Sequence, residues 1–423
     1  MIMSEGYMSR TVDSYIKELL ECMGALQIEG PKWCGKTRTS EEFAKSVLRI
    51  ENKDQIEFLK ATIGSGVKTP LEGDTPRLID EWQSVPSIWD AVRFEVDHRR
   101  KRGQFILTGS SVPPKGSIVH SGAGRIGKVS MRTMSLFESG ESNGHVSLKD
   151  LFDPGYSVDG YSEFTVERLA CAMTRGGWPE SLRDAPKSTS RIVSLYLKAV
   201  IESDISRVDD VKRDPIITRR IIESVSRNIS TSASKESVRK DVNGAEGTMT
   251  DVTLNDYLGA MEKIFFIENL PAWNPHIRSR TRLMKAPKWH FTDPSIATAA
   301  LRISSNALLS DYNTFGLLFE SLCVRDLRVY SQPMEGTLSY FGNNNGREVD
   351  LILELPGGEW GAIEVKLGGK YIDDGAKSLL KLSDDIDTEY MKRPSFMMVL
   401  TAGQFAYKRP DGVLVVPIGC LRD

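Results

Sequence analysis

The sequence predicts an α/β fold whose N-terminal part is built on a mostly parallel sheet. Three observations support this prediction: helix-like and strand-like segments alternate through the first 150 residues, short apolar strands run into polar loops, and the first strand leads through a glycine-rich loop into a helix. Such alternation is typical of parallel sheets, because each helix carries the chain back to the start of the next strand. At about 100–200 residues per domain, the 423 residues suggest two or three domains.

The individual elements follow from apolar periodicity and from the turn residues between them. In the first part we expect helices over 12–23 and 39–50 and strands over 25–30, 77–82 and 104–111. Residues 140–210 look mainly helical, with a break at 176–179, and 211–270 look like several short helices. The remainder is mixed, with helices over 314–331 and 373–386 and strands over 338–342, 348–355, 360–367, 395–401 and 412–418.

The composition excludes several classes of protein. With 40% hydrophobic and 26% charged residues, the chain has an ordinary globular composition. No apolar run approaches the roughly 18–20 residues of a membrane-spanning helix, and the first residues lack the apolar core of a secretory signal. The five cysteines are scattered and have no metal-ligand spacing. We therefore expect a soluble cytoplasmic protein with no membrane partner and no structural zinc.

Residues 30–37 carry the most specific motif. They read GPKWCGKT and match the phosphate-binding pattern GxxxxGK[ST] at every fixed position, between a predicted strand and a predicted helix. Gly30 and Gly35 let the backbone wrap around phosphate oxygens, and the helix N-terminus adds a positive dipole. Lys36 would reach the β- and γ-phosphates, and Thr37 would bind Mg²⁺. The sequence thus predicts a P-loop NTPase that binds ATP and magnesium.

Two consecutive acids end a later predicted strand, beginning 44 residues after Lys36. Asp80 would hold the magnesium through water, and Glu81 would orient or deprotonate the water that attacks the γ-phosphate. Either acid alone also fits a helix cap or a surface charge. The next strand ends in a polar loop, from which Ser110 is expected to sense the γ-phosphate, although a loop-capping hydroxyl is an equal alternative.

A second glycine-rich stretch, AGRIGK, contains Arg125. An arginine there could reach a γ-phosphate in its own chain or in a neighbouring subunit of a homo-oligomer, and a plain surface arginine is an equal alternative. Four consecutive cations at 99–102 are more simply explained as a solvated helix end than as a DNA contact.

The middle of the chain is a candidate DNA-binding region. Residues 211–290 hold 14 Lys and Arg against 9 Asp and Glu, in a chain whose net charge is −2. Three short helices are expected here, over 218–229, 234–242 and 253–264. Thr253 suits the N-cap of the third helix, which would bury Leu254, Leu258 and Ile264. Three cations on the second helix would approach phosphates: Lys235, Arg239 and Lys240. DNA reading, a protein contact and an ATPase lid all fit this segment.

A second acidic site is predicted near the C-terminus. Glu320 lies on a predicted helix, Asp350 on one strand, and Glu364 and Lys366 on the next. An acid followed 14 residues later by ExK is the PD-(D/E)xK nuclease pattern, and strand alternation puts Glu364 and Lys366 on one face. The three carboxylates would hold Mg²⁺, which activates water, while Lys366 positions or deprotonates that water. The alternative is a pair of ordinary amphipathic strands.

Taken together, the motifs resemble one family. GPKWCGKT, LIDEW, FILTGSS and AGRIGK are followed by GGWPES, YLKAVIESDI, FTDPSIA and GLLFESLCVRDL, a series similar to bacterial and archaeal AAA-type ATPases that carry a C-terminal domain of unknown function. The resemblance implies an ATPase core over 1–140, a helical and winged-helix-like region over 141–300 and a restriction-endonuclease-like domain over 301–423. Two functions stay open: an ATPase that acts on DNA as a nuclease, and an ATP-switched interaction or signalling protein whose C-terminal domain only binds.

Overall fold

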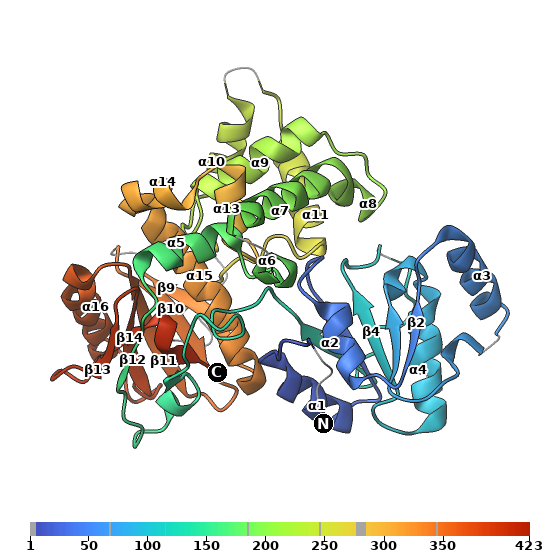
Figure 1. Cartoon of the computed structure of the whole chain (residues 1–423), viewed down its shortest axis with the longest axis horizontal. Coiled ribbons are helices and arrows are strands. Elements are labelled where there is room, and N and C mark those ends of the chain that lie inside the picture. The colour runs from blue at the N-terminus through green and yellow to red at the C-terminus, as the bar shows by residue number, and fades with distance from the viewer. Residues whose placement is uncertain are drawn as a thin grey trace. The chain divides into compact units, whose positions relative to one another are not determined.

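The chain folds into two compact units that are interleaved along the sequence. Unit 1 joins Met1–Thr133 with Glu202–Arg213 and Gly259–Phe266, and unit 2 contains Met134–Ile201, Asp214–Leu258 and Ile267–Asp423. The units therefore do not follow consecutive boundaries at residues 140 and 300. The computed structural model describes residues 6–66, 69–114, 116–183, 186–244, 247–275, 285–343 and 346–423 (Figure 1).

Unit 1 is built on five parallel strands in the order β2-β3-β4-β1-β5, which confirms the predicted α/β fold with a parallel sheet. Helices cover both faces of this sheet: on β4, Phe105 and Leu107 pack in the core cluster that contains residues of α3 and α4, whereas Ile106 packs in the cluster with α1 and α2. The strands are β1 (Ala25–Glu29), β2 (Ser46–Arg49), β3 (Arg77–Asp80), β4 (Phe105–Gly109) and β5 (Ile126–Ser130). The helices are α1 (Val12–Cys22), α2 (Lys36–Phe43), α3 (Lys53–Gly64) and α4 (Ser87–Arg99).

The helix predicted over 39–50 is wrong in its second half. Helix α2 ends at Phe43, and the next residues form β2, in which Val47 lies opposite Leu78 of β3. The side chains of β2 alternate between half-buried and exposed, which is the pattern of an edge strand. Four residues are too few for periodicity to separate a strand from the end of a helix.

Between residues 140 and 331, the α-helices of the described residues begin at residue 166, and a single 3-10 turn, Asp150–Phe152, precedes them. The expectation of a mainly helical segment is wrong for 140–165, which contains the short strands β6 (Val146–Ser147) and β7 (Gly160–Tyr161), because proline and glycine at 154–155 and glycine at 160 break a helix. The helices that follow are α5 (Val166–Arg175), α6 (Pro179–Arg183), α7 (Pro186–Ala199), α8 (Ile205–Arg207), α9 (Pro215–Arg227), α10 (Lys235–Asn243), α11 (Asp251–Lys263), α13 (Ser295–Ala300), α14 (Ser305–Ser310) and α15 (Tyr312–Ser331).

The three short helices expected in the middle region are present as α9, α10 and α11. The apolar residues expected to be buried are buried, Leu254 and Leu258 on α11 and Ile264 directly after it. The predicted N-cap is wrong, because the hydroxyl of Thr250 accepts a hydrogen bond from the backbone N–H of Thr253 at 3.2 Å. The N-cap of α11 therefore lies three residues earlier than the apolar pattern alone indicates.

Unit 2 contains an eight-stranded sheet in the order β7-β13-β14-β12-β11-β10-β9-β8. Strands β9, β10 and β11 run antiparallel, β12 runs parallel to β11, and β14 runs parallel to β12. Both edge strands come from chain that precedes residue 274. Strand β13 has no counterpart among the predicted strands. The bounds are β8 (Ala272–Trp273), β9 (Thr337–Gly342), β10 (Glu348–Glu354), β11 (Trp360–Lys366), α16 (Ile372–Asp384), β12 (Phe396–Thr401), β13 (Phe405–Lys408), β14 (Leu414–Pro417) and β15 (Leu421–Arg422), which pairs with β6.

A buried ion network stabilises the core of unit 2. The guanidinium of Arg325 lies 3.0 Å from Asp293 and 2.7 Å from Asp326, and all three side chains are buried. Asp293 also accepts from the backbone N–H of Gly177 at 3.0 Å, and Asp326 from that of Leu136 at 3.1 Å. The motifs GGWPES, FTDPSIA and GLLFESLCVRDL thus each contribute a residue to one packing contact, which gives these three a structural role.

Candidate functional site

The phosphate-binding motif forms a tight loop between β1 and α2. Gly30 and Gly35 have φ angles of 154° and 99°, and Gly35 is the N-cap residue of α2. A Cβ atom on Gly30 would lie 2.0 Å from the carbonyl oxygen of Met131, so only glycine fits at this position. The thiol of Cys34 is buried beneath the loop, 3.6 Å from the same oxygen. The loop is therefore anchored to the end of β5 through Met131.

Lys36 holds its charge inside the loop. It is the first residue of α2, and its side chain is buried. Its ammonium group donates to the carbonyl oxygens of Gly30 at 2.8 Å and Pro31 at 2.7 Å. A helix N-terminus and a lysine ammonium facing the same loop form a site for a phosphate group.

The residues expected to bind magnesium meet at the carboxyl ends of the strands. The hydroxyl of Thr37 donates to Asp80 Oδ1 at 2.9 Å, and the hydroxyl of Thr108 donates to the same oxygen. Next to them, Glu81 accepts from Ser110 at 3.2 Å. A hydroxyl and a carboxylate oxygen in contact are donors of the kind that Mg²⁺ prefers, so these residues fit the ion.

The strand order explains this convergence. Strand β4 lies between β1, which leads into the phosphate-binding loop, and β3, which ends at Asp80. Because the carboxyl ends of parallel strands lie at one edge of a sheet, Thr108 and Ser110 at the end of β4 reach both acids. Glu81 adopts a left-handed backbone conformation with φ 58°, so the chain turns sharply immediately after β3 and the two consecutive carboxylates contact different neighbours.

Arg125 lies at the opposite edge of the same sheet. Its carbonyl oxygen accepts from the backbone N–H of Ala25, the first residue of β1, at 3.1 Å. The five residues of β1 span about 16 Å at roughly 3.3 Å per residue, and the phosphate-binding loop begins at the far end. The half-exposed guanidinium contacts Asp97 at 2.9 Å. The expectation that Arg125 reaches a γ-phosphate of its own chain is therefore wrong.

Two segments distant in sequence join this unit, and no sequence signal predicted them. Lys32 of the phosphate-binding loop donates to Asp204 at 2.7 Å. After β4, the backbone N–H of Val112 donates to the carbonyl oxygen of Lys263 at 2.9 Å, and the Lys263 ammonium donates to Asp209 at 2.9 Å. The segments 202–213 and 259–266 are thus bonded to the two loops that follow β1 and β4.

The C-terminal residues of the predicted nuclease pattern also meet. The ammonium of Lys366 lies 3.2 Å from Asp350 and 2.5 Å from Glu364. The backbone N–H of Val365 donates to Asp350 at 2.8 Å, which ties β10 to β11. Helix α16 covers this part of the sheet, because the absent side chain of Gly375 would lie 3.4 Å from both Glu364 and Lys366.

A second lysine, which the sequence did not indicate, completes this site. Lys288 is buried, and its ammonium lies 2.8 Å from Glu320, 2.5 Å from Glu348 and 3.9 Å from Asp350. Asp350 therefore lies between two ammonium groups, one from Lys288 and one from Lys366. The only signal in the sequence was the local excess of cations over 211–290, which gave no reason to select residue 288.

The pKa of Asp350, the acid between the two lysines, differs in direction from the pKa values of Glu320 and Glu364 on either side. Burial, reinforced by the charge of Asp350, raises the pKa of Glu320 to about 8 against the opposing effect of Lys288. Burial and Asp350 likewise raise the pKa of Glu364 to about 8 against Lys366. At Asp350 the burial effect is outweighed by Lys366 and Lys288, so its pKa is lowered. Asp350 is therefore the most firmly ionised acid of the three.

The carboxylates in this arrangement do not fit a metal ion. Within the described ranges, no group of three or more His, Cys, Asp and Glu side chains is placed to hold one. The ammonium of Lys288 contacts Glu320 and Asp350, and that of Lys366 contacts Asp350 and Glu364. The predicted metal set of Glu320, Asp350 and Glu364 is thus brought together but bridged by lysines.

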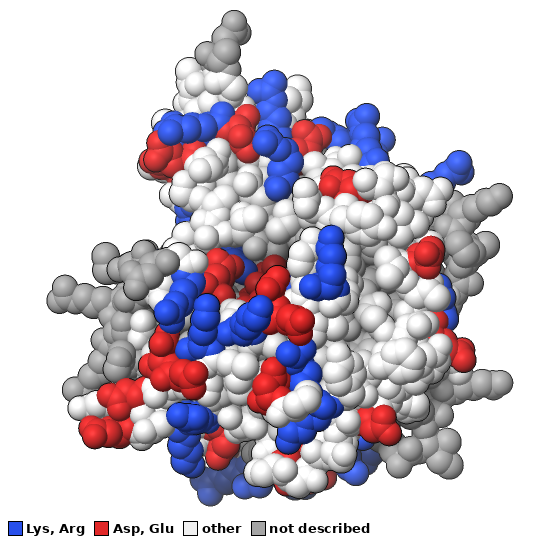
Figure 2. Space-filling model, turned by 90° about the vertical axis from the view of Figure 1, so that its left-hand side faces the viewer, with Lys and Arg blue, Asp and Glu red and all other residues white. Residues whose placement is uncertain are grey.

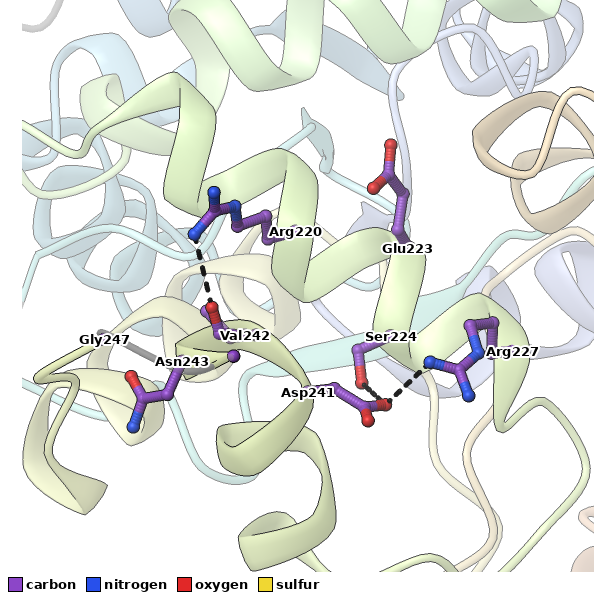
Figure 3. Close-up of a pocket in the computed structure, with 9 residues that line it drawn as sticks. Arg220, Glu223, Ser224, Arg227, Asp241, Val242, Asn243 and Gly247 are labelled. Atoms are coloured by element: carbon purple, nitrogen blue, oxygen red, sulfur yellow. Dashed lines mark hydrogen bonds and ion pairs between the residues drawn. The ribbon is translucent and has the colours of Figure 1, made fainter.

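The cations that were expected to approach DNA phosphates from the middle region lie on α10. On α10 the three cations are each paired, Lys235 with Asn255, Arg239 with Asp251 and Lys240 with Glu236. A cavity of about 630 Å³ opens between α9 and α10, lined by the cations Arg220 and Arg227 and the acids Glu223 and Asp241 (Figure 3). On the face drawn in Figure 2, basic and acidic side chains likewise lie beside one another.

Comparison with known proteins divides the chain into three matched segments. Residues 24–139 match an AAA domain, 166–307 a domain of unknown function (DUF8612) and 315–421 a domain of unknown function (DUF4143). "Uncharacterized protein Rv2008c" of Mycobacterium tuberculosis and "Uncharacterized protein Mb2031c" of Mycobacterium bovis are each 21% identical over 411 residues, which cover 96% of this chain and 83% of each relative. Among the described residues, every helix is too short or too polar to span a membrane.

Solved structures also resemble the chain. The Walker-type ATPase paby2304 of Pyrococcus abyssi is 16% identical, with a TM-score of 0.44, and the match covers 71% of this chain and 97% of that one. A STAND protein with a tetratricopeptide repeat sensor, PH0952 of Pyrococcus horikoshii, is 13% identical with a TM-score of 0.22, over 77% of this chain and 49% of that one. The stretch that matches an AAA domain, residues 24–139, contains the phosphate-binding loop between β1 and α2.

Proposed function

We propose that the protein binds ATP with Mg²⁺ at the loop between β1 and α2 and hydrolyses it. The observation that supports this most directly is the contact of Thr37 with Asp80 beside the pair formed by Glu81 and Ser110. A hydroxyl, two acids and a buried loop lysine together supply what a P-loop ATPase needs.

Each residue has a separate task in this proposal. Lys36 leaves the loop carbonyls to neutralise the β- and γ-phosphates, and Thr37 and Asp80 would hold the magnesium, which would draw charge from the phosphate oxygens. Glu81 takes a proton from water as that water attacks the γ-phosphorus, and the bond to the bridging oxygen breaks to release ADP and phosphate. Ser110, bonded to Glu81, keeps that carboxylate oriented and contacts the departing phosphate.

Phosphate release by the purified protein, with ATP and Mg²⁺, tests this proposal. Glu81→Gln should retain ATP binding and lower turnover by about 10²–10⁴-fold, the range of a general base, whereas Lys36→Ala should lose binding as well. Lys60→Ala, an exposed lysine on α3, is the matched control and should behave as wild type. Equal turnover in wild type and Glu81→Gln would contradict the assignment of the base.

From its position in the sheet, Arg125 can act only on a nucleotide bound by a neighbouring subunit. In that case turnover per molecule rises with protein concentration, and Arg125→Ala abolishes the rise. Turnover strictly proportional to concentration would leave Arg125 as a surface residue bonded to Asp97.

A second candidate function is nuclease action by the C-terminal domain. It is favoured by the element order α15-β9-β10-β11-α16-β12, with β12 parallel to β11, which gathers Glu320, Asp350, Glu364 and Lys366. The test is cleavage of single-stranded, linear and supercoiled DNA with Mg²⁺ or Mn²⁺, comparing wild type with Lys366→Ala. Cutting lost in the variant supports the nuclease. Absence of cutting in every condition favours an ATP-switched interaction protein, and ATP-dependent co-purification then identifies partners.

A further inference from the structure

We propose that Lys288 is a built-in counter-cation of the C-terminal carboxylate site, which keeps divalent metal ions away from Glu320 and Asp350. This inference concerns the same carboxylates as the second candidate function and stands against it, because metal-dependent cleavage at this site needs an ion beside Asp350.

The contacts of Lys288 are those of a cation bound by carboxylates. Its ammonium lies 2.8 Å from Glu320, 2.5 Å from Glu348 and 3.9 Å from Asp350, so it touches acids from α15 and β10 at once. The Tyr340 ring of β9 lies 5.5 Å from the ammonium and adds an aromatic face. A divalent ion at Glu320 and Asp350 would need the space that this ammonium fills.

The backbone holds Lys288 in place. Its N–H and carbonyl both bond Leu270, at 2.9 Å and 3.0 Å, in an antiparallel bridge. The next residue continues the pairing, since Trp289 exchanges hydrogen bonds with Ser230 and Thr231. Because the main chain is fixed on both sides, the side chain can leave the carboxylates only by rotating about its own bonds.

The two lysines of the site differ in access to solvent. The side chain of Lys288 is 2% exposed, whereas that of Lys366 is 25% exposed. An ion from solution can therefore compete with Lys366 for Glu364, but to reach Glu320 it must displace a buried charge. Four acids, Glu320, Glu348, Asp350 and Glu364, lie beside these two ammonium groups, and removal of Lys288 leaves only that of Lys366 among them.

The residue also joins two segments that match separate families. Lys288 lies in the stretch that matches DUF8612, and the acids it contacts lie within the stretch that matches DUF4143. A comparison confined to residues 315–421 would show a complete set of acids and miss the cation that neutralises them.

Mn²⁺ binding to the full chain, measured by electron paramagnetic resonance in the absence of nucleotide, tests the proposal. Wild type should take up no Mn²⁺ at this site at micromolar concentration. Lys288→Met should bind at least about tenfold more tightly, because a unit charge that lies 2.8 Å from Glu320 and 3.9 Å from Asp350 has been removed. Lys377→Met, an exposed lysine on α16, is the matched control and should equal wild type. To isolate this site from the phosphate-binding loop, all proteins carry Asp80→Asn.

A second measurement requires no change at Lys288. Reductive methylation followed by mass spectrometry should modify Lys377 and leave Lys288 unmodified, both without metal and with millimolar Mn²⁺. Modification of Lys288 in the folded protein, equal Mn²⁺ affinity in wild type and Lys288→Met, or no uptake by either protein would each overturn the proposal. Metal-dependent DNA cleavage by the wild type that is lost in Lys366→Ala would overturn it as well, because that cleavage needs an ion at these carboxylates.

Discussion

Replacing Arg325 by methionine should destabilise unit 2 by an amount that depends on pH. The substitution keeps most of the side-chain volume but leaves Asp293 and Asp326 buried without the guanidinium that contacts both. Breaking one buried ion pair typically costs about 3–5 kcal/mol. The alternative is that each acid takes up a proton, which at pH 7 costs about 4 kcal/mol for an ordinary aspartate at 1.36 kcal/mol per pH unit. We expect a total loss of about 4–8 kcal/mol at pH 7.

At pH 5 the loss should be smaller. The cost of protonating each carboxyl group falls by about 2.7 kcal/mol over two pH units. In the wild type, burial raises the pKa of Asp326 to about 6 against the opposing Arg325 charge. Because the pKa of Asp326 is higher in the folded state than in the unfolded state, this group adds to the free energy of unfolding at low pH, and the contribution is lost as the pH rises through about 6. The wild type therefore loses about 1 kcal/mol of unfolding free energy between pH 5 and pH 7. The free energy of unfolding that Arg325→Met removes should therefore be about 3–5 kcal/mol smaller at pH 5 than at pH 7.

Urea unfolding at both pH values measures this difference. Tryptophan fluorescence is a suitable signal, because the buried Trp178 donates to Ser295 next to the network. The control is Arg227→Met, which removes an exposed arginine whose contact with Asp241 is 3.5 Å long and should cost less than about 1 kcal/mol. If Arg325→Met loses no more than this control, or loses the same amount at pH 5 and pH 7, the network is not held by the charge of Arg325.

Three further predictions concern backbone fit, a helix cap and magnesium. A Cβ on Gly177 would lie 2.0 Å from the carbonyl oxygen of Met134, whereas a Cβ on Gly259 in α11 would have no atom within 4 Å. Thermal unfolding should therefore show that Gly177→Ala destabilises the protein by about 1–3 kcal/mol. Gly259→Ala should stabilise it by about 0.5–1 kcal/mol. Thr250→Ala should cost about 1 kcal/mol through the lost cap of α11, and no change in urea midpoint would refute that cap. Asp80→Asn should weaken binding of a fluorescent ATP analogue at least tenfold with Mg²⁺, which corresponds to a loss of about 1.4 kcal/mol or more, and leave binding without Mg²⁺ nearly unchanged.

The local parts of the ATPase site could be predicted from the sequence. Residues 30–37 form the phosphate-binding loop and the start of α2 through contacts between neighbours in the chain. The positions of Asp80 and Ser110 could also be predicted, because the carboxyl ends of parallel strands lie at the same edge of the sheet. The place of Arg125 could not be predicted, since the glycine-rich stretch around it turns before β5 rather than after it. The residue type can be read from the sequence, but the end of the sheet at which the residue lies depends on how the strands are connected.

Long-range pairs account for what the sequence missed. Lys288 contacts Glu320 across 32 residues, and Lys32 contacts Asp204 across 172. No local pattern predicts such contacts, because each lysine alone looks like a surface charge. The motifs resembling the AAA-type family pointed to one architecture, and three of them meet at Arg325. These three motifs are needed for packing in unit 2, so they indicated the architecture of the chain and little about its chemistry.

The strand order of the second sheet has a consequence for how this C-terminal region can be inherited. Its edge strands β7 and β8 come from residues 160–161 and 272–273. A polypeptide beginning at residue 301 would expose β13 and β9 as bare edges, and unpaired edges recruit other chains. Fusion of residues 301–423 alone to another protein would therefore leave both edges of the sheet unpaired. The region must be inherited together with the helical segment that contains β7 and β8, or the protein that receives it must supply a strand at each edge.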